Sequence, residues 1–243
     1  MARRNAEPSI GLSFVLLFFV LSSIILGIDG VMGLSSSLST NQAAVAVQAK
    51  AMVVGGRAPL GSAINVPGSV LTEHEIAHMR YMREEEKLAR DVYLALANQW
   101  NIPVFSKIAQ AEQRHMDAVL GLLNRYGIPD PAANTEIGQF MDPSLASLFN
   151  TLMKKGSLSS TDALQVGGLI EEVDIADLEY AVASTNRNDI IRVYQNIHRG
   201  SRNHLRAFAG TLAQHGIVYQ PQKLNSTEVQ AILSSPMENG PPI

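Results

Sequence analysis

Between residues 70 and 219, apolar residues recur at the three- and four-residue spacing of an α-helix, in long segments separated by breaks. The first segment follows Thr72, which forms a capping-box pattern with Glu75, and it continues to Trp100. Apolar residues make up 46% of the chain but aromatic residues only 6%, which suits interdigitated helices better than a β-sandwich. We therefore expect an all-α fold.

The breaks between the helical segments indicate the topology. Short breaks at residues 101–103 and 186–188 predict two helical hairpins, and a link of about thirty residues joins them. A ferritin-like bundle contains one such crossover, whereas a simple up-and-down bundle needs none. The sequence therefore predicts a ferritin-like four-helix bundle over residues 70–219, with a short helix in the crossover. After the first helix, the expected helices run from Phe105 or Ser106 to Gly127, from Asp142 and Pro143 to Gly156, from Ser159 or Ser160 to about Ala183, and from about Asp189 to His215.

An export signal is predicted in residues 1–28. Arg3 and Arg4 precede an uncharged apolar run from Ile10 to Ile28, an arrangement that favours leaving the amino terminus inside. The run is longer than the usual core of a signal peptide and just long enough to span a bilayer, so cleavage and retention as a membrane anchor are both open. We expect an exported protein that is extracellular or anchored with its folded part outside.

The segments on either side of the helical domain are simpler. Residues 29–69 are rich in Ser, Ala, Gly and Val without a sustained period, which is typical of a linker. Residues 220–243 form a tail in which a turn at Asn225 precedes a short helix. Neither segment carries a motif that predicts a function.

The charge balance and the absence of cysteine exclude several classes of function. A net charge of −3 produces no large positive field, so nucleic acid is not an expected partner. Without cysteine the chain has no disulfides, zinc–thiolate sites, iron–sulfur clusters or thiol catalysis. A metal site in this chain has to use oxygen and nitrogen ligands.

Ionisable residues interrupt the apolar stripe of the second predicted helix. Glu112 and His115 are three residues apart, in the pattern E-x-x-H, and they share a helix face with Ile108, Val119 and Leu122. An unpaired charge inside a bundle is costly to desolvate, so such residues should be paired, protonated or bound to a metal. A metal ion would satisfy both side chains at once, although a lone E-x-x-H is a weak signal.

Residues of ligand type also interrupt the apolar stripes of the other three long helices. On the first helix, Glu85 and Glu86 both project near apolar residues, and periodicity does not separate them. Carboxylate bridges with one imidazole per metal suit iron or manganese, so a pair of such ions is expected. The predicted ligands are Glu85 or Glu86 from the first helix, Glu112 and His115 from the second, Glu171 and Asp174 from the third, and His204 from the fourth.

Other ionisable residues are placed outside the predicted site. Glu172 aligns with Glu179 on a face of the third helix that we expect to be more exposed. His198 aligns with Arg202, as is typical of a surface residue. Three more histidines lie near helix ends, where capping or solvent exposure is expected: His74, His78 and His215.

These motifs resemble those of the ferritin-like superfamily, and of rubrerythrin-type bundles most closely. The stretch EKLARDVY, from Glu86 to Tyr93, is similar to the rubrerythrin pattern E-x-x-A-R-x-x-Y, and this resemblance favours Glu86 over Glu85. The stretch AEQRHMDAVL resembles the E-x-x-H of the second helix. More narrowly, EEEKLARDVYLAL, FSKIAQAEQRHMDAVL, IEEVDIADL and RGSRNHLRAF resemble an uncharacterised bacterial and archaeal ferritin-like family, known as a domain of unknown function.

The resemblance implies a dinuclear centre, from which this chain departs at one position. The fourth helix of the superfamily supplies a second E-x-x-H, but here Ser201 stands three residues before His204. Asp174 would then supply the missing oxygen ligand from the third helix. If the site is that of an enzyme, we expect Glu112 and Glu171 to bridge the ions, Glu86, His115 and His204 to be terminal ligands, and Asp174 to complete one coordination sphere.

Two classes of function remain open. As an oxidase or peroxide-detoxifying enzyme, the protein would use iron or manganese to activate O2 or peroxide, with Tyr93 as a hydrogen-bond donor or redox-active phenol. The chain lacks the cysteine-bound iron centre of a rubrerythrin-type reductase, so it would need an external electron donor or a dismutation cycle. Alternatively, it is a non-catalytic metal-binding or structural surface protein with a degenerate site. Membrane contact through residues 10–28 and assembly into a homo-oligomer are compatible with either function.

Overall fold

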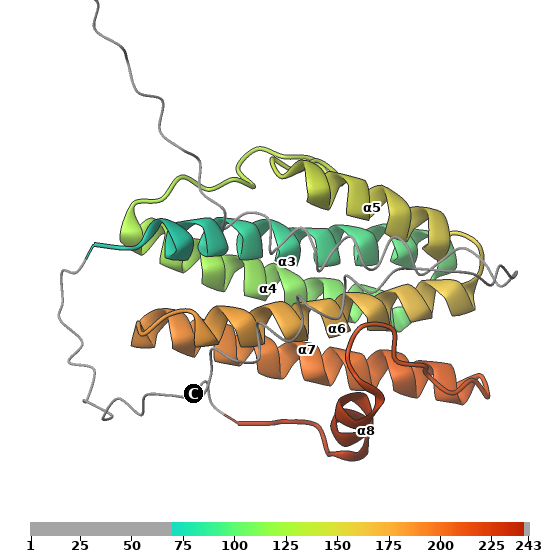
Figure 1. Cartoon of the computed structure of the whole chain (residues 1–243). Helices are drawn as coiled ribbons and strands as arrows, with labels where there is room; N and C mark the ends of the chain where they lie inside the picture. Colours follow the sequence, from blue (N-terminus) through green and yellow to red (C-terminus); the bar gives the residue numbers. More distant parts are fainter. Residues whose placement is uncertain (1–69, 241–243) are drawn as a thin grey trace, which may run out of the picture.

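The computed structural model describes residues 70–240, which form α-helices and connecting segments (Figure 1). Six helices and no strand lie in this range, so the all-α prediction is confirmed for it. None of these helices is long and apolar enough to cross a membrane. The predicted signal peptide or anchor at residues 1–28 and the linker at 29–69 lie outside the described residues. The helices are α3 (Glu73–Trp100), α4 (Pro103–Tyr126), α5 (Pro143–Gly156), α6 (Ser160–Ala183), α7 (Asn188–Gln214) and α8 (Ser226–Ser234).

The ends of the first two helices follow the chemistry of their caps. Thr72 and Glu75 form the predicted capping box: the Glu75 N–H donates to Thr72 Oγ1 at 3.1 Å, and the Thr72 N–H donates to Glu75 Oε2 at 2.9 Å. α4 begins at Pro103, ahead of the predicted Phe105, because proline is favourable at the first position of a helix. Gly127 caps the other end with a φ of 67°, a left-handed conformation that glycine adopts without strain.

The four long helices α3, α4, α6 and α7 lie side by side (Figure 1). α3 packs along α4 and α6 packs along α7, so each short connection joins neighbouring helices. The two pairs meet where α3 contacts α6 and where α4 contacts α7. The long connection between the pairs carries α5, which packs against α3 and α6. One face of each long helix is therefore turned towards a shared interior, where the ligand-type residues were predicted.

The chain after α7 folds back against α6 and buries Glu172. The Tyr219 hydroxyl donates to the Glu172 carboxylate. The backbone N–H groups of Gln222, Lys223 and Leu224 donate to the same carboxylate at distances of 2.7 to 3.1 Å. The prediction that Glu172 lies on a more exposed face is therefore wrong, because a segment beyond the long helices covers the carboxylate and satisfies its charge.

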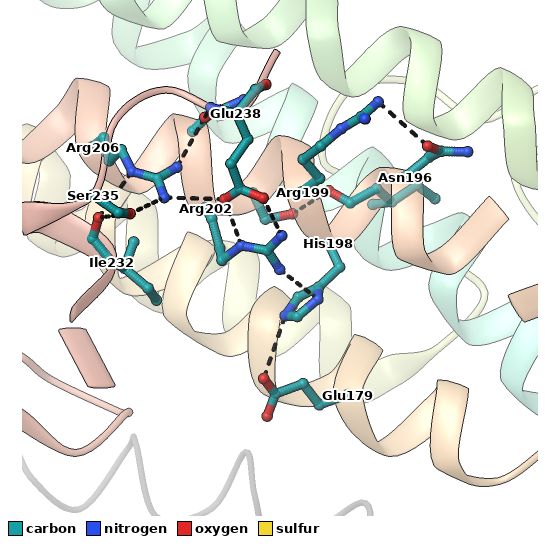
Figure 2. Close-up of polar contacts among 12 residues, drawn as sticks. Glu179, Asn196, His198, Arg199, Arg202, Arg206, Ile232, Ser235 and Glu238 are labelled. Carbon is teal, nitrogen blue, oxygen red and sulfur yellow. Dashed lines mark hydrogen bonds and ion pairs between the residues drawn. The ribbon is translucent and has the colours of Figure 1, made fainter. Parts of the chain in front are cut away.

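A polar cluster attaches the end of the described chain to α7 (Figure 2). The Glu238 carboxylate accepts hydrogen bonds from Arg202 Nε at 2.7 Å and from Arg206 Nη2 at 3.0 Å. Asn203 donates to the Glu238 carbonyl at 3.0 Å and accepts from its N–H at 2.8 Å. His198, predicted to be a surface residue, is half-buried in this cluster with its Nδ1 2.6 Å from Arg202 Nη1. The cluster holds His198 away from the interior between the long helices.

Replacing Glu238 with glutamine should weaken this attachment in a pH-dependent way. Hydrogen bonds from Arg202, and then from Arg206, hold the pKa of the Glu238 carboxyl at about 2, below its ordinary 4.5. The charged carboxylate thus contributes stability that is fully present above its ordinary pKa and is lost as the pH falls towards 2. We expect Glu238→Gln to lower the free energy of unfolding by about 1 kcal/mol at pH 7 and by less at about pH 3. Urea denaturation at both pH values measures the difference, and an equal loss at both would contradict the expectation.

Candidate metal centre

One group of ligand-type side chains connects α3 with α4. His115 Nδ1 lies 2.7 Å from Glu112 Oε2 and 3.3 Å from Glu86 Oε2. The E-x-x-H spacing places Glu112 and His115 one turn apart on the same face of α4, and Glu86 reaches them from α3. Both carboxylates are buried, and the imidazole is 14% exposed. We call Glu86, Glu112 and His115 the first triad, because they offer ligand atoms that all lie within 4.8 Å of one another.

A second group connects α4 with α6 and α7, and it uses the same Glu112. His204 Nδ1 lies 2.8 Å from Glu112 Oε1 and 3.4 Å from Glu171 Oε2. Glu112, Glu171 and His204 form the second triad, again with ligand atoms within 4.8 Å of one another, and all three residues are buried. The two oxygens of Glu112 therefore face different triads, Oε2 towards His115 and Oε1 towards His204. The two imidazole rings stack with their centroids 5.4 Å apart.

The contacts around Glu112 are close but poorly aligned for hydrogen bonding. Glu112 Oε1 and His204 Nδ1 are buried 2.8 Å apart, yet neither atom has a hydrogen-bond partner of acceptable geometry. Glu86 Oε1 is also buried without a partner. Buried polar atoms of this kind raise the free energy of the folded state unless another group satisfies them. A convergence of unaligned oxygen and nitrogen donors fits cations held between them, so the residues present fit a metal centre.

Charge interactions separate the pKa values within the two triads. Burial would raise the pKa of Glu112, but the neighbouring His204 and His115 hold it well below its ordinary value. Burial would lower the pKa of His204, but Glu112 and Glu171 raise it to about 10. Burial raises the pKa of Glu86 to about 7, against the opposite effect of His115. The imidazoles therefore carry protons that balance the buried carboxylates, and a metal ion that binds here has to displace them.

Tyr93 on α3 orients Glu171. Its hydroxyl donates to Glu171 Oε1 at 2.6 Å, while Glu171 Oε2 faces His204. The Tyr93 ring is buried against Phe105 and Phe208, with centroid distances of 6.2 and 5.2 Å. Burial and the charge on Glu171 raise the pKa of the phenol well above 10, so the hydroxyl keeps its proton and acts as a donor. Tyr93 is thus the hydrogen-bond donor that was predicted, and its hydroxyl reaches across the interior to Glu171 on α6.

Asp174 lies beside the triads but belongs to neither of them. Its Oδ2 accepts a hydrogen bond from the Ser201 hydroxyl, and its Oδ1 is buried without a partner. Burial raises the pKa of Asp174 well above its ordinary value, and the charges of Glu86 and Glu171 raise it further. Ser201, at the position where the family resemblance implied glutamate, donates to the carboxylate that was predicted to replace that glutamate.

The structure separates Glu85 from Glu86, which periodicity left equivalent. Glu86 belongs to the first triad, whereas Glu85 is buried outside both triads and interacts with Asp177. Burial, then the charges of Asp177 and Asp174, raise the pKa of Glu85 well above its ordinary value. Glu86, which the family resemblance favoured, is thus the residue that lies beside the ligand-type side chains of α4. Five of the predicted ligand positions come together in the triads: Glu86, Glu112, His115, Glu171 and His204.

A glycine on α7 gives His115 the room to lie beside the helix. A Cβ atom added at Gly200 would lie only 2.6 Å from His115 Nε2 and 2.8 Å from His115 Cε1. The imidazole therefore packs directly against the α7 backbone on its Nε2 side, while Nδ1 faces the carboxylates. Any larger residue at position 200 has to push the ring or the helix away.

Buried charges on another face of α3 went unrecognised in the sequence. Lys87 Nζ donates to Asp91 Oδ2 at 2.5 Å and to the Glu136 carbonyl at 2.7 Å. Glu84 accepts the Met141 N–H at 2.5 Å. These contacts attach the connection between α4 and α5 to α3. The spacing of four residues between Lys87 and Asp91 was an available signal for an ion pair, but nothing local indicated its burial.

The prediction that histidines near helix ends are capping or exposed residues is correct for His215, which is exposed at the C-cap of α7, and wrong for His78, which is buried and is not the cap of α3. His78 is 8% exposed, because the first turns of α3 pack against the end of α6. Its ring centroid lies 5.3 Å from that of Tyr180 on α6. His74, one turn earlier, is half-buried beside it.

Fold and site together define a helical protein with a candidate metal centre of carboxylates and histidines. Residues 75–236 match the family described as an uncharacterised protein domain, DUF2202, and the chain belongs to this family. It is 48% identical over 176 residues to the uncharacterised protein MJ0754 of Methanocaldococcus jannaschii, a match that covers 72% of this chain and 95% of that protein. A crystal structure titled hypothetical protein MJ0754 from Methanococcus jannaschii is similar with a TM-score of 0.69 and 48% identity, covering 71% of this chain and 99% of that chain. The predicted relation to an uncharacterised family is confirmed, and the family match includes every residue of both triads.

Substituting Gly200 with alanine should displace His115 from the first triad. Gly210→Ala is the control, because no atom lies within 4 Å of the Cβ that would be added there. Replacing glycine with alanine at such an open helical position should raise the free energy of unfolding by about 0.5–1 kcal/mol. At Gly200 the contact with His115 should cancel or reverse that gain. Denaturation of both variants and NMR of the His115 imidazole nitrogens check this. Equal stabilisation by the two variants, with unchanged His115 resonances, would contradict it.

Proposed function

We propose that residues 70–219 form a ferritin-like four-helix bundle that binds two iron or manganese ions in a carboxylate–histidine centre. The observation that carries this proposal is the position of Glu112, whose two oxygens face different triads. A carboxylate placed in this way can bridge two cations. In ferritin-like di-metal proteins, glutamates and E-x-x-H motifs on four helices project inward to form such a centre.

The donor set supports the choice of metal and the role of each residue. Oxygen donors with one imidazole for each ion suit iron or manganese, and a chain without cysteine offers no thiolate for softer sites. When bound, such ions would supply redox chemistry with O2 or peroxide. The proposed bridge is Glu112, with Glu86 and His115 holding one ion and Glu171 and His204 holding the other.

We propose a role for Glu171 other than the bridging role expected in the enzyme hypothesis. Tyr93 donates to one oxygen of Glu171, and the other oxygen faces His204. We therefore assign Glu171 as a terminal ligand whose orientation is held by Tyr93. Glu112 of α4 would then be the carboxylate that both ions share.

A cavity beside the triads supports the proposal that the protein acts on a small substrate. It is lined by the triad carboxylates Glu86, Glu112 and Glu171 and by the apolar side chains of Leu148 and Leu152 from α5. Apolar walls with a few convergent polar groups are typical of ligand sites. The enzymatic form of the proposal is an oxidase or a peroxide-detoxifying protein, with an external electron donor or a dismutation cycle. If the apolar run at residues 10–28 directs export, this chemistry takes place outside the cell, in a released or a membrane-anchored protein.

A non-catalytic metal-binding protein is the second candidate, and Ser201 favours it. Ser201 replaces a carboxylate ligand, and Asp174, the expected substitute, binds the Ser201 hydroxyl instead of joining a triad. The ligand set is then smaller than in a complete superfamily site. Such a centre could hold metal for storage or structure without turning over a substrate.

Metal content tests the proposed centre. The full chain, produced with iron or manganese supplied and purified in a mild detergent, should hold about two ions per molecule. Glu112→Ala should lose both ions because both share this carboxylate, whereas His115→Ala should lose mainly the ion of the first triad. His198→Ala is the matched control: this histidine is on α7 but outside the triads, and its loss should leave the content unchanged. Elemental analysis of the four proteins gives the comparison.

Peroxide or O2 consumption by the metal-loaded chain separates the two candidates. Turnover that disappears in Glu112→Ala supports an enzyme, and stoichiometric metal without turnover supports the non-catalytic protein. Native chain and Glu112→Ala with equally little iron and manganese would contradict both.

A further inference from the structure

A second pair of histidines occupies the first turns of α3, away from the triads. His74 and His78 are four residues apart, so they lie on the same face of the helix. Their ring centroids are 4.6 Å apart. His78 and Glu86 are eight positions apart on α3, which corresponds to about 12 Å along the helix axis. The pair is therefore distinct from the proposed dinuclear centre.

The surroundings of the pair contain polar atoms that lack partners. His78 is 8% exposed, and its Nδ1 is buried without a hydrogen-bond partner. The Tyr194 hydroxyl on α7 is also buried without a partner. Both residues line one small pocket together with His74, Ser184 and Thr185. Two unsatisfied polar groups on the wall of one pocket indicate a site for a polar ligand or an ion.

Glu75 indicates what kind of site this is. The sequence from His74 to His78 reads HEIAH and matches H-E-x-x-H, in which two histidines bind zinc and the glutamate serves as general base in metallopeptidases. Here Glu75 Oε1 accepts from Thr185 Oγ1 at 2.7 Å and from Arg187 Nε at 3.1 Å, and Oε2 belongs to the capping box with Thr72. The carboxylate is fully engaged and is not free to activate water. The pocket therefore suits binding and not hydrolysis.

We propose that His74 and His78 bind a divalent transition-metal ion, of the zinc, nickel or copper class, through one imidazole nitrogen each. Imidazole is a preferred ligand for these ions, and two histidines one turn apart on a helix can reach the same ion. The Tyr194 hydroxyl would hydrogen-bond a water molecule on the ion. An ion in this pocket would connect α3, through its ligands, to α7, through the water held by Tyr194.

Zinc titration of the full chain tests this site. Isothermal titration calorimetry with Zn²⁺ should show one zinc equivalent that His74→Ala binds at least about tenfold more weakly than the native chain. His74 is half-buried, so its loss should preserve the fold, which circular dichroism verifies. His215→Ala is the control, since His215 lies exposed at the end of α7. The same difference between native and His74→Ala should appear in the Glu112→Ala background, where the triads are disabled.

The results of this titration can be distinguished from those of the test of the proposed dinuclear centre. Loss of the zinc equivalent in His74→Ala and in His78→Gln, with native iron or manganese content, supports the proposal. Retention of that equivalent by a folded His74→Ala chain overturns it, and so does an equal loss in His215→Ala. The proposal is also overturned if all zinc binding by the native chain is lost in Glu112→Ala, because that zinc would then belong to the triads. The pocket would in that case be a site for water.

Discussion

The carboxylate of Glu112 is buried between two imidazoles, one from its own helix and one from α7. A buried carboxylate without compensating charge would strongly destabilise the fold, so its neighbours have to stay in place. His115 and His204 supply that compensation, and Glu86 and Glu171 bring α3 and α6 to the same point. All four long helices therefore meet at one charge. Protons on the imidazoles balance this charge, and the same side chains offer ligand atoms that could hold a metal ion in their place.

The helices were predictable because caps and periodicity act over a few residues. The capping box at Thr72 and the left-handed Gly127 are local, and both were recognised; Pro103 was taken as a break and proved to be the first residue of α4. The burial of Glu172 was not predictable in this way. Its hydrogen-bond donors lie 47 to 52 residues further along the chain, in a segment without helical periodicity. Local pattern carries no information about such a contact.

In the candidate site too, features that depend on local pattern were predictable and those that depend on distant contacts were not. Ligand-type residues within apolar stripes led to Glu112, His115, Glu171 and His204, because a charged residue stands out against an apolar background. On α3 the same pattern narrowed the choice only to Glu85 or Glu86. Periodicity failed on α3, where every face is covered: Glu84 bonds to the connection before α5, Glu85 faces Asp177, and Glu86 joins the first triad. Nor did periodicity indicate that the Asp174 carboxylate accepts a hydrogen bond from a hydroxyl on α7 and lies outside both triads.

Two adjacent carboxylates on α6 point in different directions. Glu171 faces the second triad, and Glu172 faces the segment that follows α7. Successive residues of a helix differ by about 100° around its axis. A rotation of α6 about its axis would therefore move both carboxylates away from their partners at the same time. The helix is thus held against rotation from two sides. Tyr219 and Leu224 donate their hydrogen bonds to Glu172, and by fixing that residue they also keep Glu171 directed towards the interior.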